Sequence, residues 1–366
     1  MKQGRTPDTG FPARDLLARV LLRGGLRPDR RLPFPGAVFL KGRLLRGRLL
    51  AGGPWLPLLA TLILLLGPAA RDAGAARCRT VPACIAQLQF GESRNDREYA
   101  AIILGERGDR SALGVLTKAI KEDKGEFVRV KAAQALGRLG SPRGLPPLTE
   151  TLKNDRRERV REEAARAIGR LGLKDGLAPL TEALGDDAEW RVRQTAALAL
   201  ANLGNGAAEP LGEALANDAR TEVRLAAAQS LAELKGTGAV EALTRALGGD
   251  AQPAVRTAAA RALGPASGEK IGEALGEALE KDRERGVRRA VARALGVRKE
   301  KEAMEVLIRA LQSDSSLAVR KEAAEALGMI GGDRAKEALL YFAANAELEE
   351  IRTAAGNVLD RSFSKP

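Results

Sequence analysis

Small and aliphatic side chains recur along most of this chain in a unit of about 32 residues. The unit reads Val-Arg-x-x-Ala-Ala-x-Ala-Leu-Gly, and its apolar positions are spaced as on one side of an amphipathic helix. The alanines would let a neighbouring helix approach closely. Successive copies begin at Val128, Val160, Val192, Val223, Val255, Val287, Val319 and Ile351. Such regular spacing predicts a tandem array of similar helices.

A second apolar pattern precedes each of these helices and predicts a partner helix for it. It consists of residue pairs four positions apart: Leu116/Ile120, Leu148/Leu152, Leu180/Leu184, Leu211/Leu215, Leu243/Leu247, Leu275/Leu279, Leu307/Leu311 and Leu339/Ala343. One unit earlier the same spacing falls on Cys84 and Leu88, so the array is predicted to start near Thr80. Residues 80–361 then hold nine helix pairs, and the first is degenerate because Asp96 replaces the valine.

These helix pairs predict the fold class. One pair alone cannot bury both of its faces, whereas stacked pairs share a continuous core. We therefore expect an all-α fold without a sheet: a right-handed α-solenoid, or α–α superhelix, of about nine helix pairs. The solenoid should occupy residues 77–366, with repeats over about 80–361. Aromatic residues are only 3% of the chain, so the core must be assembled from many small contacts.

The repeated unit resembles the HEAT-like repeat first associated with phycobilisome lyase subunits, and the resemblance covers about three quarters of the chain. It is specific for the fold and weak for function, because one fold hosts many functions. It implies a scaffold that binds other proteins or, alternatively, an accessory subunit of an enzyme complex, as phycobilin lyase subunits are. The family includes deoxyhypusine hydroxylase, whose iron ligands are His-Glu pairs. This chain contains no histidine, which argues against that activity.

An aspartate recurs five residues before each valine that begins a repeated unit. A row of carboxylates could bind cations, but an aspartate at a helix–helix turn also satisfies free backbone N–H groups, and Asp155-x-x-Glu158 has the spacing of a capping box. Because every copy carries the residue, we expect a structural role. The resemblance implies an aspartate–arginine ladder between repeats, formed by Asp123, Asp155, Asp187, Asp218, Asp250, Asp282 and Asp314 with Arg129, Arg161, Arg193, Arg224, Arg256, Arg288 and Arg320.

The residue types that are missing exclude most chemistry. The chain has no histidine, the commonest general base and metal ligand, and two cysteines cannot complete a four-ligand zinc site without it. We therefore predict no catalytic residues, no metal and no cofactor, and assign the chain as a non-enzyme. Carboxylates alone can catalyse some reactions, as in glycosidases, but the carboxylates in register with the repeat have a structural explanation.

The charge of the chain is concentrated at its beginning. The formal net charge is +13, and residues 1–48 hold twelve Lys/Arg against three Asp/Glu, or +9 of it. The repeats are nearly balanced, and their most basic stretch, Arg285 to Lys299, lacks aromatic residues for base stacking, so we predict no nucleic-acid partner. Residues 1–48 lack periodicity and are predicted to be a disordered basic leader. Alternatively, the start site is assigned too early, and Val38 would begin an ordinary signal.

Residues 49–76 predict export. No charged residue occurs from Leu49 to Ala70, basic residues precede this segment, and Ala73-Gly74-Ala75 fits a cleavage site. We expect a secretory signal cleaved near Ala76 and a periplasmic or extracellular protein. The alternative is an uncleaved membrane anchor over residues 49–70, the only membrane contact that we predict. In an exported chain Cys78 and Cys84 would form a disulfide, although Cys84 occupies a core position where a free thiol would also fit.

The outward positions of the second helices are the predicted binding surface, because solenoids commonly bind protein partners on their concave side. An ordinary solvated face is the alternative for these positions. Trp190, the only tryptophan in the repeats, would either anchor a partner or cover apolar surface beside a turn. The candidate surface comprises Arg138, Arg166, Arg170, Trp190, Arg289 and Arg293.

Overall fold

In the computed structural model, residues 78–234, 236–268 and 270–363 are described, and within them the chain forms eighteen α-helices and no strand. The predicted leader and signal segment, residues 1–48 and 49–76, lie outside this part. The nine pairs are α3 (Val81–Phe90) and α4 (Arg94–Arg107), α5 (Leu113–Glu122) and α6 (Glu126–Leu139), α7 (Leu145–Asn154) and α8 (Glu158–Leu171), α9 (Leu177–Asp186) and α10 (Trp190–Leu200), α11 (Ala208–Asn217) and α12 (Thr221–Glu233), α13 (Thr237–Gly249) and α14 (Pro253–Leu263), α15 (Ile271–Lys281) and α16 (Arg285–Arg298), α17 (Met304–Ser313) and α18 (Leu317–Ile330), and α19 (Asp333–Asn345) and α20 (Glu349–Phe363).

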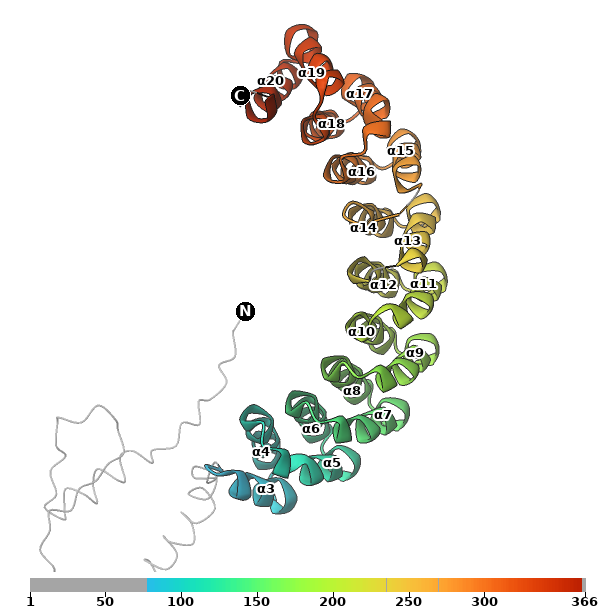
Figure 1. The fold of residues 1–366 in the computed structure, drawn as a ribbon. Helices are drawn as coiled ribbons and strands as arrows, with labels where there is room; N and C mark the ends of the chain where they lie inside the picture. The colour runs from blue at the N-terminus through green and yellow to red at the C-terminus, as the bar shows by residue number, and fades with distance from the viewer. Residues whose placement is uncertain (1–77, 235, 269, 364–366) are drawn as a thin grey trace, which may run out of the picture. The chain divides into compact units, whose positions relative to one another are not determined.

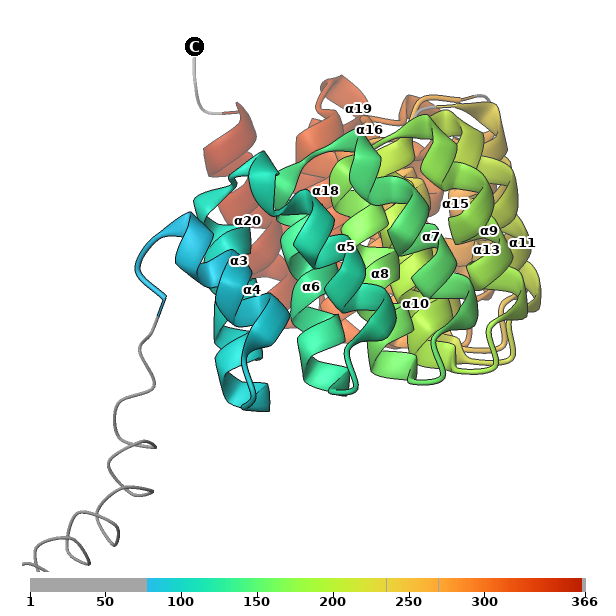
Figure 2. The same cartoon turned by 90° about the horizontal axis from the view of Figure 1, so that it is seen from below.

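The helices are arranged in two layers, as an α-solenoid requires. Figure 1 shows the even-numbered helices on the concave side of the repeat array and the odd-numbered helices on its convex side. Figure 2, seen from below, shows how successive helices of each layer stack side by side. The predicted all-α solenoid of nine pairs is therefore confirmed. No helix in the described part of the chain is both long and apolar enough to cross a bilayer.

Small side chains explain why the even-numbered layer lies on the concave side. A Cβ added at Gly169 of α8 would lie 2.7 Å from the Cβ of Ala199 in α10, and one added at Gly296 of α16 would lie 2.7 Å from the Cα of Ala326 in α18. Only glycine facing alanine permits such an approach between helices. The odd-numbered helices contact one another less extensively, so the array bends towards the even-numbered side.

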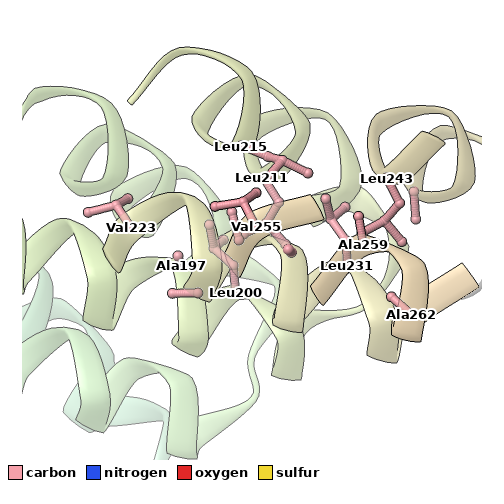
Figure 3. Close-up of a cluster of buried hydrophobic side chains, with 14 of the residues drawn as sticks. Ala197, Leu200, Leu211, Leu215, Val223, Leu231, Leu243, Val255, Ala259 and Ala262 are labelled. Atoms are coloured by element: carbon pink, nitrogen blue, oxygen red, sulfur yellow. The ribbon is translucent and has the colours of Figure 1, made fainter. Parts of the chain in front are cut away.

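Aliphatic side chains fill the space between the two layers. Leu200 of α10, Leu211 of α11, Leu231 of α12 and Leu243 of α13 are almost completely buried, and Figure 3 shows them packed together with valines and alanines of neighbouring repeats. The same positions are buried in each following repeat, so one core runs through the array. Each buried leucine contributes about 1.5–3 kcal/mol by leaving water.

Glycines end several concave helices as the sequence predicts. Gly140 after α6 and Gly172 after α8 have φ of 61° and 62°, in the left-handed region that an L-residue enters only with strain. The chain then turns through a short 3₁₀ segment into the next convex helix. Five such 3₁₀ segments precede convex helices, namely α5, α7, α9, α11 and α17. One more, Ala201–Leu203, directly follows α10.

Candidate functional site

The recurring aspartates and arginines form an ion-pair ladder along the N-terminal ends of the even-numbered helices. In each rung the arginine Nε donates to Oδ2 of the next repeat's aspartate at 2.6–2.8 Å, and Nη2 donates to Oδ1 at 2.8–3.1 Å. Two parallel hydrogen bonds fix both partners in one plane. The seven rungs are Arg97–Asp123, Arg129–Asp155, Arg161–Asp187, Arg193–Asp218, Arg224–Asp250, Arg256–Asp282 and Arg288–Asp314.

Each rung also bonds to the turn between the paired helices. Arg129 Nη1 donates to the carbonyl of Asp123, its own repeat's aspartate, at 2.9 Å. Asp155 Oδ1 accepts the backbone N–H of Arg157 at 2.9 Å. The expected capping box at Asp155 and Glu158 is therefore wrong: Asp155 follows the end of α7, Arg157 precedes α8, and no side chain caps that helix. The carboxylate orders the turn and receives an arginine from the preceding repeat instead.

The arginines of the ladder differ from the prediction at both ends of the array: Arg97 belongs to it and Arg320 does not. Arg97 forms the first rung, and its place one unit before Arg129 was the available signal. Arg320 forms no rung, because the next repeat has Ala346 where an aspartate would be needed. The Nε of Arg320 instead donates to the carbonyl of Leu311 at 2.8 Å. The assignment of Arg320 to the ladder is corrected accordingly.

The electrostatic balance of a rung favours the ionised carboxylate. Burial alone would raise the pKa of Asp282, but hydrogen bonds from Arg256 and from the N–H of Glu284, with the nearby charges of Arg256 and Arg288, lower it below its ordinary value. The pKa values of Asp218 and Asp314 are lowered in the same way. The side chain of Asp282 is only 6% exposed, so water screens its pair with Arg256 weakly.

On the concave face, the arginines of α8 are neutralised within their own helix. Arg166 donates to Glu162 Oε1 at 2.6 Å and also pairs with Glu163. Arg170 donates to Glu163 at 3.3 Å. Glu163 is buried, so its charge needs these partners. Two arginines and two glutamates leave no net charge on this cluster.

The arginines of α14 and α16 form a different kind of cluster. Arg261, Arg289 and Arg293 line a hollow of about 490 Å³ together with Glu322 of α18. The only ion pair there is a long one, 3.7 Å between Arg289 Nε and Glu322 Oε2. Arg289 and Arg293 were among the residues of the predicted candidate surface, whereas Arg261 and Glu322 were not. The place of Glu322 three residues after the valine, where α8 has Glu163, was the signal.

The two remaining candidate residues lie apart from these clusters. Arg138 is exposed at the last turn of α6 and has no ion pair. Trp190 begins α10, beside the ladder, and packs against the core while its ring lies between Arg191 and Arg220, with guanidinium carbons 4.6 and 5.1 Å from the ring centroid. These two cation–π contacts and the packing against the core agree with the prediction that Trp190 covers apolar surface beside a turn.

At the start of the described residues, Cys78 and Cys84 form a disulfide that ties the chain before α3 to its first turn. No group of three or more potential metal-ligating side chains occurs in the described residues. What the arrangement offers chemically is a set of exposed guanidinium groups on a rigid concave face. Such groups bind carboxylates and phosphates through paired hydrogen bonds.

Comparison with solved structures finds similar chains at low sequence identity. Kap121p bound to Pho4p is similar over 82% of this chain and 40% of its own, with 14% identity and a TM-score of 0.57. Human deoxyhypusine hydroxylase is 24% identical over 73% of this chain and 99% of its own, with a TM-score of 0.32. The complex of CpcE and CpcF of phycocyanin lyase from Nostoc is 22% identical over 79% and 97%, with a TM-score of 0.35. At these identities the likeness shows the fold alone.

Comparison with curated proteins gives no match. A family model of HEAT repeats matches residues 81–169, 146–215, 208–274 and 272–360, which together span the described array. The match agrees with the helix pairs, the buried valine and leucine positions and the ladder. This chain therefore belongs to the HEAT repeat family.

Proposed function

We propose that this protein is a non-catalytic scaffold that binds a protein partner on the concave face of its repeat array. The observation that carries the proposal is the open cluster of Arg261, Arg289 and Arg293, whose guanidinium groups make no hydrogen bond within the described structure. Arginines that only stabilised the fold would be paired, as those of the ladder are. Exposed arginines on a rigid surface are typical anchors of protein interfaces.

The shape of the array supports the same function. Each repeat contributes one concave helix, so a partner can contact several repeats at once, and affinity can come from many modest polar contacts. Few exposed aromatic residues are available as anchors on these helices, so the binding should be polar and sensitive to salt.

The experiment is capture of the partner from an extract of the native cells, with the full chain as bait. Arg289→Glu with Arg293→Glu, and separately Arg166→Glu with Arg170→Glu, reverse charge on the concave face. Lys118→Glu with Arg245→Glu makes the same charge change at exposed, unpaired positions of α5 and α13 on the convex face. We expect Arg289→Glu/Arg293→Glu to lose the partner and the convex variant to keep it, while Arg166→Glu/Arg170→Glu shows whether the contact extends to α8. Thermal unfolding of each variant is measured in parallel.

Each other outcome has a definite meaning. If both concave variants captured the partner as well as the unchanged chain, the assignment to this face would be wrong. Turnover of a substrate by the purified chain alone would overturn the scaffold function itself. An enzyme recovered as the partner would give the scaffold an accessory role in that enzyme complex.

We further propose that the protein acts outside the cytoplasm. The support is the apolar segment at residues 49–70 with its following Ala73-Gly74-Ala75 and the disulfide between Cys78 and Cys84, since disulfides persist mainly in oxidising compartments. N-terminal sequencing of the native protein tests this. We expect a start near Ala76 in a periplasmic or extracellular fraction. A start near Met1 in the membrane fraction would favour the anchor, and the same start in a soluble cytosolic fraction would refute export.

A further inference from the structure

We infer that the concave face around α16 is a binding site for an acidic, extended segment of a protein partner. The inference rests on the proposed scaffold function and specifies both the place and the chemistry of the contact. Three observations support it: several cationic side chains are unpaired, these side chains line two hollows, and the lining of the hollows has no aromatic side chain on which a nucleic-acid base could stack.

The first observation is a local surplus of unpaired cations. Within the described residues, Arg261, Arg285, Arg293 and Lys321 make no ion pair, and Arg289 makes only its long pair with Glu322. Some exposed cations elsewhere pair with the adjacent repeat, as Arg309 does with Glu280, and others, such as Arg138, are unpaired. What marks this region is that its unpaired cations lie together on the neighbouring helices α14, α16 and α18.

The second observation is that these side chains line two neighbouring hollows. One holds Arg261, Arg289 and Arg293 and measures about 490 Å³. The other, about 700 Å³, lies towards the ladder and is lined by Arg283, Arg285, Ser315, Ser316 and Lys321, among others. The two hollows are neighbours, because consecutive residues line them. Arg288 and Lys321 border the larger hollow, and the next residues along the chain, Arg289 and Glu322, border the smaller one. Both hollows border α16, and the basic side chains that line them are together called the basic track.

The charge of this track selects its occupant. Apart from Arg288, which Asp314 neutralises, six cationic residues and two carboxylates line the hollows. The cations are Arg261, Arg283, Arg285, Arg289, Arg293 and Lys321, and the carboxylates are those of Glu284 and Glu322. An acidic chain would therefore release the mutual repulsion of the arginines and form hydrogen bonds with them, as the aspartates of the ladder do with theirs. The chain's own residues 1–48, with a net charge of +9, would be repelled.

The lining also separates an acidic peptide from a nucleic acid. Beyond its charged groups, the track is lined by small or aliphatic residues such as Thr257, Ala290, Leu317 and Ala318, and no aromatic side chain borders either hollow. Single-stranded nucleic acids need aromatic surfaces on which bases stack, whereas a polypeptide of aspartate and glutamate needs only guanidinium groups at side-chain spacing.

The test is site mapping with a photoreactive peptide of ten glutamates carrying one benzophenone, added to the full chain and followed by mass analysis of the adducts. We expect adducts within α14, α16 and α18, and at least a tenfold lower yield there in Arg289→Glu/Arg293→Glu. The convex control, Lys118→Glu/Arg245→Glu, should match the unchanged chain within about twofold. Mapping distinguishes this site from adducts on the basic residues 1–48.

Three outcomes would overturn the inference: adducts confined to residues 1–48 or to the convex helices, an equal loss of yield in both double variants, or a single-stranded oligonucleotide that displaces the peptide at lower concentration than the peptide itself. The proposed function would fail on a different result, which is turnover of a substrate by the purified chain alone. If Arg289→Glu/Arg293→Glu still captured the native partner while Arg166→Glu/Arg170→Glu did not, the scaffold would stand and this site would be rejected.

Discussion

Arg288 and Arg289 are consecutive residues of α16 with opposite environments. The side chain of Arg288 is 10% exposed and forms two hydrogen bonds to Asp314 and one to the carbonyl of Asp282. That of Arg289 is 55% exposed, and its closest carboxylate oxygen is 3.7 Å away. A rotation of about 100° per residue along a helix carries one side chain to the ladder and the other to the concave face.

The difference between these two regions shows how the same residue type serves folding in one place and recognition in another. A ladder arginine contacts two repeats through groups that water hardly reaches, so removing it leaves a buried carboxylate without its partner. A concave arginine contributes little to the fold, because an exposed charge in water needs no partner. Four experiments test or refine this distinction, in order of decreasing expected effect.

Arg288→Ala should reduce the free energy of unfolding by about 2–3 kcal/mol, since the charged hydrogen bonds to Asp314 are lost and its carboxylate stays largely buried. Arg289→Ala should change it by less than about 0.5 kcal/mol, as expected for an exposed position. Urea unfolding of both variants measures the contrast. Equal effects would mean that the ladder does not hold the repeats together.

Asp250→Ala removes a carboxylate that accepts two hydrogen bonds from Arg224 and one from the N–H of Gln252. We expect a loss of about 2 kcal/mol, larger than the value of about 1 kcal/mol for a helix cap alone. Asp250→Asn, which keeps the acceptor for Gln252 but loses the charge, should lie between Asp250→Ala and the unchanged chain. A loss no greater than that of a cap would assign the carboxylate to the turn rather than to the bridge between repeats.

The two concave clusters can be interconverted. Ala290 of α16 occupies the repeat position of Glu163 in α8, where the glutamate pairs with the arginine three residues later. Ala290→Glu should therefore neutralise Arg293 and lower the yield of glutamate-peptide adducts on α16 about fivefold, close to 1 kcal/mol. Glu163→Gln should release Arg170, leave Arg166 paired with Glu162 alone, and raise the yield on α8. An unchanged yield in both variants would separate peptide binding from the pairing state of the arginines.

The smallest effect is the pH dependence of the ladder. The pKa values of Asp218, Asp282 and Asp314 are lowered in the folded chain, so their ionised forms stabilise it. This stability is fully present above the ordinary aspartate pKa, near 3.9, and is lost as the pH falls through the lower folded values. Thermal unfolding should therefore be constant from about pH 5 to 7 and decline below about pH 4. Asp282→Asn should flatten that decline, and an identical decline in the variant would place its origin elsewhere.

Much of the fold could be predicted from the residues because the same apolar spacing occurs in every repeat. The spacing of Val160, Ala164, Ile168 and the preceding leucines was sufficient for helix pairs, their register and an all-helical array. The residue types of the ladder were visible for the same reason. The bridge between repeats came from the resemblance to HEAT-like repeats and not from the spacing, since a cap and a bridge require the same residue beside the same turn.

The candidate binding surface could not be located from the residue pattern, because it is formed by side chains of different helices. The sequence alone determined that Arg166 and Glu163 could pair, because three residues separate them on one helix. Only the stacking of repeats decided that Arg261 of α14, Arg289 of α16 and Glu322 of α18 line one hollow, and that no carboxylate reaches Arg293. The pairing of neighbours within a helix follows from its fixed 3.6-residue turn, whereas the distance between side chains on different helices follows from how closely glycine and alanine let those helices approach.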